Sequence, residues 1–137
     1  MEQALRPRVL IVDDDLSIRR SLHDLLEDYG VQVVGEAGDG LQALTMAIAL
    51  LPDVVLMDLR MPVLGGLDAT LHLTSTLPAV QVIVCTAYTD ETICERAREA
   101  GAAAVVAKGD HPSEVLAAIR QAWIQVQADR AWEAIPS

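Results

Sequence analysis

Two short apolar runs in this chain end directly on aspartate. Val9–Val12 runs into three consecutive acids, Asp13–Asp15, and Val54–Met57 runs into Asp58. Short continuous apolar runs are typical of strands that are buried on both faces of a parallel sheet. Because the carboxyl ends of parallel strands meet at one edge of the sheet, we expect these carboxylates to lie close together. Like charges at such short range repel one another unless a cation lies among them.

A cation is available at the end of a further apolar run. Lys108, the only lysine in the chain, follows Ala102–Ala107 directly. Carboxylates together with one cation are the groups that proteins use to hold Mg²⁺ and a phosphoryl group. The sequence therefore indicates a site for a divalent ion and a phosphoryl group at the strand ends.

The remainder of the chain alternates strand and helix signals. Helical spacing follows Asp15 and stops at Gly30, whereas Asp39 with Gln42 resembles a capping box, and Pro112 suits the first turn of a last helix. Strands alternating with helices imply a parallel sheet covered on both faces, because each parallel connection needs a crossover. The predicted strands are 9–12, 31–35, 54–58, 80–85 and 103–107, and the predicted helices are 18–29, 39–51, 67–76, 90–100 and a last one from 112.

The predicted fold class is α/β, with a doubly wound, five-stranded parallel sheet and five helices. Sheets of this type bind ligands beyond the carboxyl ends of their strands, and the flavodoxin-like strand order is 2-1-3-4-5. We expect that order here. It would place Asp13 and Asp14 beside Asp58, with Thr86 and Lys108 at the ends of the next strands.

Composition sets the broad class of the chain. At 137 residues and 52% hydrophobic content it fits one compact domain, which we assign to residues 1–124, with 125–137 as a C-terminal helix extension or linker. A net charge of −10 with scattered arginines disfavours direct binding to nucleic acid or an anionic membrane. No apolar stretch approaches bilayer length and residues 1–8 lack the apolar segment of a signal peptide, so we expect a cytoplasmic protein.

Four motifs, in order across residues 8 to about 124, resemble the receiver domain of two-component response regulators. Any one of them alone is weak, but four in register are specific. The motifs are Val12-Asp13-Asp14, then Asp58-Leu59-Arg60-Met61-Pro62 followed by Gly65-Gly66-Leu67, then Thr86-Ala87, and finally Lys108.

The resemblance implies a role for each acid at the predicted site. Asp58 would be the phosphoacceptor, which takes a phosphoryl group from a histidine kinase and becomes an aspartyl phosphate. Asp14 and Asp58 would ligate Mg²⁺ directly, together with the backbone carbonyl of Arg60, and Asp13 would act through water. Mg²⁺ suits such a set because it accepts one or two carboxylates, keeps several waters and bridges to phosphate oxygens.

The resemblance also implies a switch. Lys108 would pair with the phosphoryl oxygens and the Thr86 hydroxyl would donate a hydrogen bond to one of them, contacts that exist only after phosphorylation. The implied output face is formed by helix 90–100, the strand at Val105 and the last helix, which are helix 4, strand 5 and helix 5 of the family fold. A partner or a second copy of the domain, giving a homodimer, would dock there.

Two departures from the family pattern affect this switch. Val105 stands where many receivers carry a Tyr or Phe that turns inward on activation, so the usual aromatic switch is not expected. Gly109-Asp110 follows Lys108 in place of the common cis proline, which resembles the subgroup with helix-turn-helix output domains. A DNA-binding output domain would then belong to a longer parent chain.

Arg60 and Tyr88 lie two residues beyond the phosphoacceptor and the threonine, where the family tunes hydrolysis of the acyl phosphate. One hypothesis is that this bulky pair shields the phosphoryl group from water. The alternative is that both are ordinary surface residues.

Three other functions are compatible with parts of the pattern. A degenerate receiver would bind partners without phosphorylation. Val105 favours this interpretation, whereas the complete set of acids, Thr86 and Lys108 argues against it. An enzyme of the haloacid dehalogenase type would want a second acid two residues after the nucleophile, where this chain has Arg60. A flavin-binding fold is disfavoured because the first loop is acidic where a flavin phosphate needs hydroxyl and backbone donors.

The end of the last helix is open to three interpretations. Apolar residues at spacings of three and four predict a stripe that faces the sheet, with Trp132 on the opposite side. Beyond about Gln125 the segment could be a linker, a dimer-forming helix or a frayed tail, and we favour a linker or frayed tail. The stripe consists of Leu116, Ile119, Trp123 and Val126.

Overall fold

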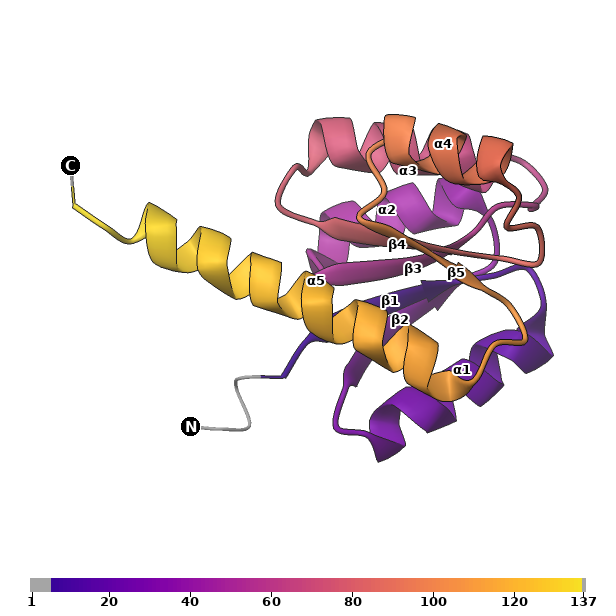
Figure 1. The fold of residues 1–137 in the computed structure, drawn as a ribbon, viewed down its shortest axis with the longest axis horizontal. Coiled ribbons are helices and arrows are strands. Elements are labelled where there is room, and N and C mark those ends of the chain that lie inside the picture. The colour runs from indigo at the N-terminus through magenta and orange to yellow at the C-terminus, as the bar shows by residue number, and fades with distance from the viewer. Residues whose placement is uncertain (1–5, 137) are drawn as a thin grey trace.

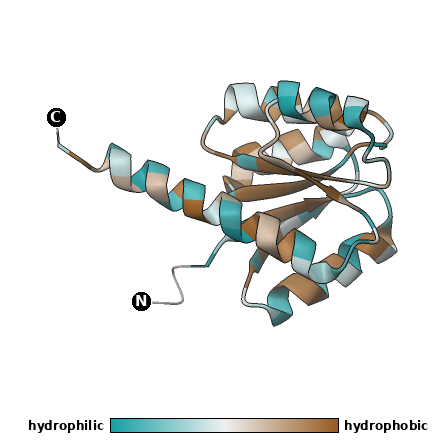
Figure 2. Cartoon of the chain, in the orientation of Figure 1, coloured by the Kyte–Doolittle hydropathy of each residue, from teal (hydrophilic) through white to brown (hydrophobic). Residues whose placement is uncertain are grey.

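The computed structural model describes residues 6–136 as a single parallel sheet with helices on both faces (Figure 1). The five strands have the order β2-β1-β3-β4-β5, so the predicted flavodoxin-like order and the α/β class are confirmed. Figure 2 shows the strands as the most hydrophobic part of the chain, as expected for a sheet that is buried on both sides. The strands are β1 (Arg8–Val12), β2 (Gln32–Ala37), β3 (Val54–Asp58), β4 (Gln81–Thr86) and β5 (Ala104–Ala107).

Four helices connect these strands and a fifth follows the last strand, and the helix ends follow the predicted signals. Asp15, Asp39 and Asp90 each cap a helix N-terminus by accepting backbone N–H groups, and Pro112 opens the last helix. Gly30, with φ +80, ends the first helix in the left-handed conformation. The helices are α1 (Leu16–Asp28), α2 (Gly40–Leu50), α3 (Gly66–Thr76), α4 (Glu91–Glu99) and α5 (Pro112–Glu133).

The sheet separates two apolar layers. Helices α2, α3 and α4 cover one face, where Ala43, Ala69 and Leu73 pack against β1, β3 and β4. Helices α1 and α5 cover the other face, where Leu26 and Ile119 are fully or almost fully buried. The two layers hold the carboxyl ends of the strands at a common edge, which is where ligands bind in open α/β sheets.

Strand β2 is displaced from its predicted position: it ends at Ala37, whereas the sequence predicted an end at Gly35. Glu36 interrupts the apolar run, yet it pairs with Ile11 in the β1–β2 ladder. Its carboxylate accepts one hydrogen bond from Nε of Arg19 at 3.3 Å and contacts Nδ1 of the His23 ring at 2.8 Å, so the polar side chain is tolerated in the strand.

Helix α5 continues without interruption to Glu133 and projects beyond the sheet (Figure 1). Val126 is its last buried residue. Further along, Arg130 forms an ion pair with the buried carboxylate of Asp53, which precedes β3. Residues 125–133 are therefore a helical extension that is anchored to the domain. Between residues 6 and 136, no helix is both long and apolar enough to cross a membrane.

Candidate functional site

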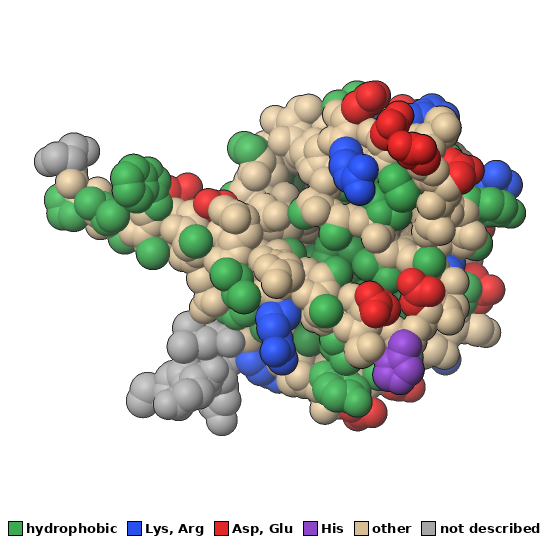
Figure 3. Space-filling model, viewed as in Figure 1, with side chains coloured by type: hydrophobic (Ala, Val, Ile, Leu, Met, Phe, Trp, Pro, Cys, Tyr) green, Lys and Arg blue, Asp and Glu red, His purple; other side chains and the backbone are tan. Residues whose placement is uncertain are grey.

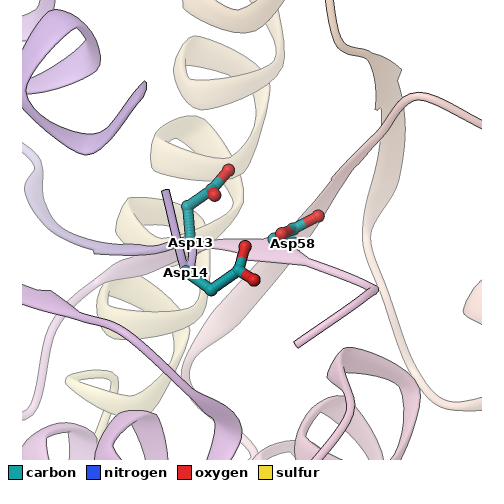
Figure 4. A group of neighbouring side chains, drawn as sticks. All are labelled: Asp13, Asp14 and Asp58. Atoms are coloured by element: carbon teal, nitrogen blue, oxygen red, sulfur yellow. The ribbon is translucent and has the colours of Figure 1, made fainter. Parts of the chain in front are cut away.

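Three carboxylates converge at the carboxyl edge of the sheet (Figure 4). Asp58 is the last residue of β3, and Asp13 and Asp14 follow β1, whose Val12 is in register with Met57. One carboxylate oxygen from each of the three acids lies within 4.8 Å of the other two. Asp13 and Asp58 are buried, whereas Asp14 is exposed to solvent. The juxtaposition expected from the sequence is therefore present.

Lys108 bridges the two buried acids. Its Nζ atom lies 2.7 Å from Oδ2 of Asp13 and 2.9 Å from Oδ1 of Asp58. The backbone N–H of Lys108 donates to the carbonyl of Thr86 at 2.8 Å, which ties the end of β5 to the end of β4. One cation thus contacts the residue that follows β1 and the last residue of β3, while its backbone is bonded to β4.

The electrostatics follow from this arrangement. Burial, and next the neighbouring charge of Asp13, raise the pKa of Asp58 above its ordinary value of 3.8, although Lys108 acts in the opposite direction. Burial by itself would lower the pKa of Lys108, but the hydrogen bonds to Asp13 and Asp58 outweigh it and raise that pKa above 10.5. Negative charge at Asp58 is therefore costly in this site unless a cation compensates it.

The acids line a cleft of about 230 Å³ that also contains Arg60, Thr86 and Lys108. Thr86 is buried, and its Oγ1 accepts a hydrogen bond from the backbone N–H of Tyr88 at 3.1 Å. All the site residues expected from the sequence therefore border one cleft.

Arg60 and Tyr88 lie together beside the same cleft. The guanidinium carbon of Arg60 is 3.9 Å from the centroid of the Tyr88 ring, which is a cation–π contact. Tyr88 keeps 49% of its surface exposed. The pair links the loop after β3 to the loop after β4 at the border of the cleft.

Asp13 has a support that sequence reasoning missed. Arg19, on α1, donates from its guanidinium to the backbone carbonyl of Asp13 and is itself bound to Glu36 on β2. In addition, Oδ1 of Asp13 accepts the backbone N–H of Asp15 at 2.9 Å. Nothing in the local sequence marks Arg19, because its two partners come from other elements.

Gly66 fits closely against the backbone of Asp58. A Cβ atom at this position would lie 2.0 Å from the Asp58 carbonyl oxygen, and the Gly66 N–H donates to the carbonyl of Leu59 at 2.9 Å. The start of α3 thus rests on the end of β3, at Asp58, and on Leu59 in the loop that follows. The glycine pair at 65 and 66 was noted in the sequence, but its packing role needed the structure.

The nearby thiol is not a reactive group. Cys85 precedes Thr86 on β4, and burial raises the pKa of its thiol to about 12. A thiol with such a pKa stays protonated near neutral pH and is a poor nucleophile. Among the described residues at this edge, the carboxylates are the nucleophiles available.

The donor set suits a small, hard divalent cation. Carboxylate oxygens are the protein ligands that Mg²⁺ prefers, and it keeps part of its water shell when bound by few of them. Three carboxylate oxygens within 4.8 Å, beside a cleft open to solvent through Asp14, provide such ligands together with room for water. The residues present therefore fit Mg²⁺.

Comparison with known proteins agrees with this geometry. The family model described as the response regulator receiver domain matches residues 9–120. The chain belongs to this family. Among relatives of this receiver domain, the response regulator GacA of Pseudomonas aeruginosa is 43% identical over 115 residues, 83% of this chain and 54% of GacA. The transcriptional regulatory protein PdtaR of Mycobacterium tuberculosis is 40% identical over 121 residues, 88% of this chain and 58% of PdtaR.

Solved structures agree as well. The crystal structure of a two-component response regulator of the LuxR family from Aurantimonas sp. SI85-9A1 superposes with a TM-score of 0.84 at 32% identity. The match covers 88% of this chain and 86% of that one. The receiver domain described here spans little more than half the length of GacA and PdtaR.

Proposed function

We propose that this receiver domain is a phosphorylation-controlled switch whose phosphoacceptor is Asp58. The observation that carries the proposal is the bridge of Lys108 to Asp13 and Asp58 inside a group of three converging carboxylates. Two buried carboxylates with one shared cation are costly to maintain unless they act on a charged ligand. A phosphoryl group with its divalent ion is a ligand of that kind.

The chemical step is a transfer to a carboxylate oxygen. An oxygen of Asp58 forms a bond to phosphorus while the bond from phosphorus to the donor nitrogen of a kinase histidine breaks, and that nitrogen keeps the electron pair. Lys108 is placed to pair with the phosphoryl oxygens, because its Nζ already contacts Asp58 at 2.9 Å. Transfer of the phosphoryl group from Asp58 to water would return the domain to its resting state.

Asp13, Asp14 and Asp58 would hold Mg²⁺, with Asp13 acting through water and with the backbone carbonyl of Arg60 as a further ligand. When bound, the ion would neutralise part of the negative charge on the phosphoryl group during its transfer. Arg19 and the Asp15 N–H orient Asp13 from behind, so that this acid faces the cleft.

The switch depends on contacts that form only with a phosphoryl group. The Thr86 hydroxyl would donate to a phosphoryl oxygen, and Lys108 would shift toward the same group. The backbone bond from Lys108 to the Thr86 carbonyl couples the ends of β4 and β5, so a movement of either reaches α4, β5 and α5. Val105 is half-buried on β5 with no aromatic ring to turn inward, so the coupling would pass through these strand ends.

Arg60 and Tyr88 would determine how long the phosphoryl group lasts. Their contact at 3.9 Å places a guanidinium and a ring side by side at the border of the cleft. Such a pair would hinder the approach of water in line with the bond between phosphorus and Asp58. The proposal therefore includes slow loss of the phosphoryl group.

The partners follow from this role. A histidine kinase would supply the phosphoryl group, and a second domain would be controlled through α4, β5 and α5. Because GacA and PdtaR are longer than this chain and the Aurantimonas neighbour is of the LuxR family, we propose a DNA-binding output domain in a longer parent chain. A cytoplasmic location is part of the same proposal.

The test is incubation of the protein with Mg²⁺ and acetyl phosphate, followed by intact-mass spectrometry. Wild type should gain one phosphoryl group, and Asp58→Asn should gain none. A matched control is Asp68→Asn, which removes an exposed acid on α3 outside the carboxylate cluster and should leave phosphorylation intact. Wild type without any adduct would instead favour a degenerate receiver that acts without phosphorylation, and rapid turnover of many phosphoesters would favour a phosphatase.

A further inference from the structure

A carboxylate on β2 has no part in the proposed phosphorylation. Glu36 interrupts the apolar pattern of the strand, and its side chain is 25% exposed. Both of its oxygens are bound to helix α1: Oε1 accepts a hydrogen bond from Nε of Arg19 at 3.3 Å, and Oε2 lies 2.8 Å from Nδ1 of His23. A partly buried charge gives up hydration that an apolar side chain would not need. The contacts of Glu36 therefore indicate why a charge is present there.

The contacts of Glu36 lead through Arg19 to the backbone of Asp13. Arg19 donates from Nη1 to the carbonyl oxygen of Asp13 while its Nε is bound to Glu36. Because the guanidinium is planar and rigid, fixing Nε also fixes the direction in which Nη1 points. Without Glu36, the flexible stem of Arg19 could adopt several rotamers, and ordering it would cost entropy. Glu36 thus holds Arg19 in the rotamer that reaches Asp13.

The end of β2 holds both backbone groups of Asp13. The Asp13 N–H donates to the carbonyl of Ala37 at 3.0 Å. The Asp13 carbonyl is held by Arg19, which is anchored on Glu36. Glu36 and Ala37 are consecutive residues of the strand. The turn from β1 into α1 is therefore fastened at its first residue to one short stretch of β2.

The carbonyl that Arg19 holds belongs to the peptide group between Asp13 and Asp14. A peptide group is planar, so a fixed carbonyl also fixes the N–H of Asp14 and the position of its Cα. Asp14 is exposed, so the backbone determines where its carboxylate lies more than packing does. The contact with Arg19 therefore acts on two of the three acids that Figure 4 draws together.

We infer that Glu36 is a positioning residue for the divalent ion, which acts through Arg19 on the peptide group between Asp13 and Asp14. The inference rests on the magnesium site of the proposed function and adds a residue that touches neither the ion nor the phosphoryl group. Mg²⁺ demands near-ideal octahedral geometry, so a small rotation of this peptide group would misplace both acids. Removal of an outer group that orients metal ligands typically weakens metal binding about 10–100-fold.

Positioning and charge predict opposite results for Arg19. Arg19 is a cation beside an anionic site, so its removal should strengthen the attraction of Mg²⁺ if charge alone matters. If Arg19 positions the acids, Arg19→Met should instead weaken Mg²⁺ binding about tenfold. Acidic side chains occur at many places on the face of the molecule that Figure 3 shows, so the loss of one more distant charge should have little effect in salt.

Two replacements of Glu36 separate its hydrogen bond from its charge. Glu36→Gln and Glu36→Ala both lose the negative charge, but only glutamine can still accept from Arg19 while its amide donates to the other tautomer of His23. In titration calorimetry, Glu36→Gln should bind Mg²⁺ nearly as wild type does, and Glu36→Ala should bind it about tenfold more weakly.

Glu27→Ala is the matched control. Glu27 also joins α1 to β2, because its carboxylate accepts the backbone N–H of Val33 at 2.8 Å. It lies about two helical turns along α1 from Arg19, so its removal deletes a charge and a link between the same two elements without affecting Asp13. Mg²⁺ binding by Glu27→Ala should therefore equal that of wild type.

A measurement without metal tests the same geometry. The backbone amide resonance of Asp14 in an NMR spectrum reports on the peptide group that Arg19 holds. It should shift in Arg19→Met and Glu36→Ala and keep its position in Glu36→Gln and Glu27→Ala. At saturating Mg²⁺, all four variants should be phosphorylated by acetyl phosphate at the wild-type rate, because positioning changes only the concentration of Mg²⁺ that is required.

The outcomes separate this inference from the proposed function. Unchanged or tighter Mg²⁺ binding by Arg19→Met, or equal weakening by the two Glu36 variants, would overturn the role of Glu36 and leave the magnesium site in place. A wild type that binds no Mg²⁺ would overturn both. Since the Glu36 pair and the Arg19 variant test the same contact, a variant that fails to fold in thermal unfolding leaves the other to decide.

Discussion

Substitution of Gly66 by alanine should damage both the fold and the site. The added Cβ would lie 2.0 Å from the carbonyl oxygen of Asp58 and 2.7 Å from Cα of Leu59, whereas ordinary van der Waals contact begins near 3.4 Å. Both neighbours are backbone atoms, so neither can rotate away as a flexible side chain would. Either α3 or the loop after β3 has to move.

The expected cost lies at the upper end of the range for overpacking, about 3 kcal/mol. For a chain of this length the melting temperature falls by about 3–4 °C per kcal/mol, so Gly66→Ala should melt about 10 °C below wild type. The folded fraction should also accept phosphoryl groups more slowly, because the displaced carbonyl belongs to Asp58 itself.

Gly65→Ala is the matched control. A Cβ at Gly65 would meet only the Leu59 carbonyl oxygen at 3.6 Å, and its φ of −71° is open to any residue. Because Gly65 is the N-cap of α3, alanine there should cost about 0.5–1 kcal/mol through a poorer cap. Thermal and urea unfolding of both variants give the comparison. Equal stability of the two variants would refute the packing explanation.

Three further predictions concern the charged cleft. Lys108→Met leaves two buried acids without their shared cation, so it should lower the free energy of unfolding at neutral pH by about 2–3 kcal/mol. The loss is smaller than for a fully buried pair because the Lys108 side chain is 25% exposed. Urea unfolding of this variant should show that part of the lost stability returns on acidification. Because the pKa of Asp58 is raised in the folded state, the free energy of unfolding without Mg²⁺ should increase as the pH falls through that pKa toward the unfolded value of 3.8. Asp58→Asn should flatten this part of the plot of unfolding free energy against pH. An unchanged plot would contradict a raised pKa at Asp58. Arg60→Ala and Tyr88→Ala should each speed loss of the phosphoryl group by about 2–5-fold, the rate change that corresponds to the energy of one exposed cation–π contact. Unchanged decay of the radiolabelled protein would refute the shielding hypothesis.

Much of the fold was predictable because its signals are local. Apolar runs, the caps at Asp15 and Asp39 and the stop at Gly30 depend on residues close in sequence, and they located the strands and helices to within a few positions. The convergence of the acids was predictable because parallel strands end at one edge. The position of Lys108 at the same edge followed from the same rule.

The features that were missed depend on partners distant in the chain. Glu36 looks like the end of β2 until its contacts with Arg19 and His23 on α1 are known. The support of Asp13 by Arg19 is hidden for the same reason. Arg130, on the part of α5 that follows Gln125, reaches 77 residues back to Asp53, a contact that no local pattern reports.

We propose that the converging acids host a divalent ion, and titration calorimetry with Mg²⁺ measures that binding. Wild type should bind one Mg²⁺, Asp58→Asn and Asp14→Asn should each weaken binding at least tenfold, and Asp68→Asn, outside the cluster, should bind like wild type. No measurable uptake by wild type, or equal uptake by Asp58→Asn and Asp68→Asn, would show that these acids do not form a Mg²⁺ site.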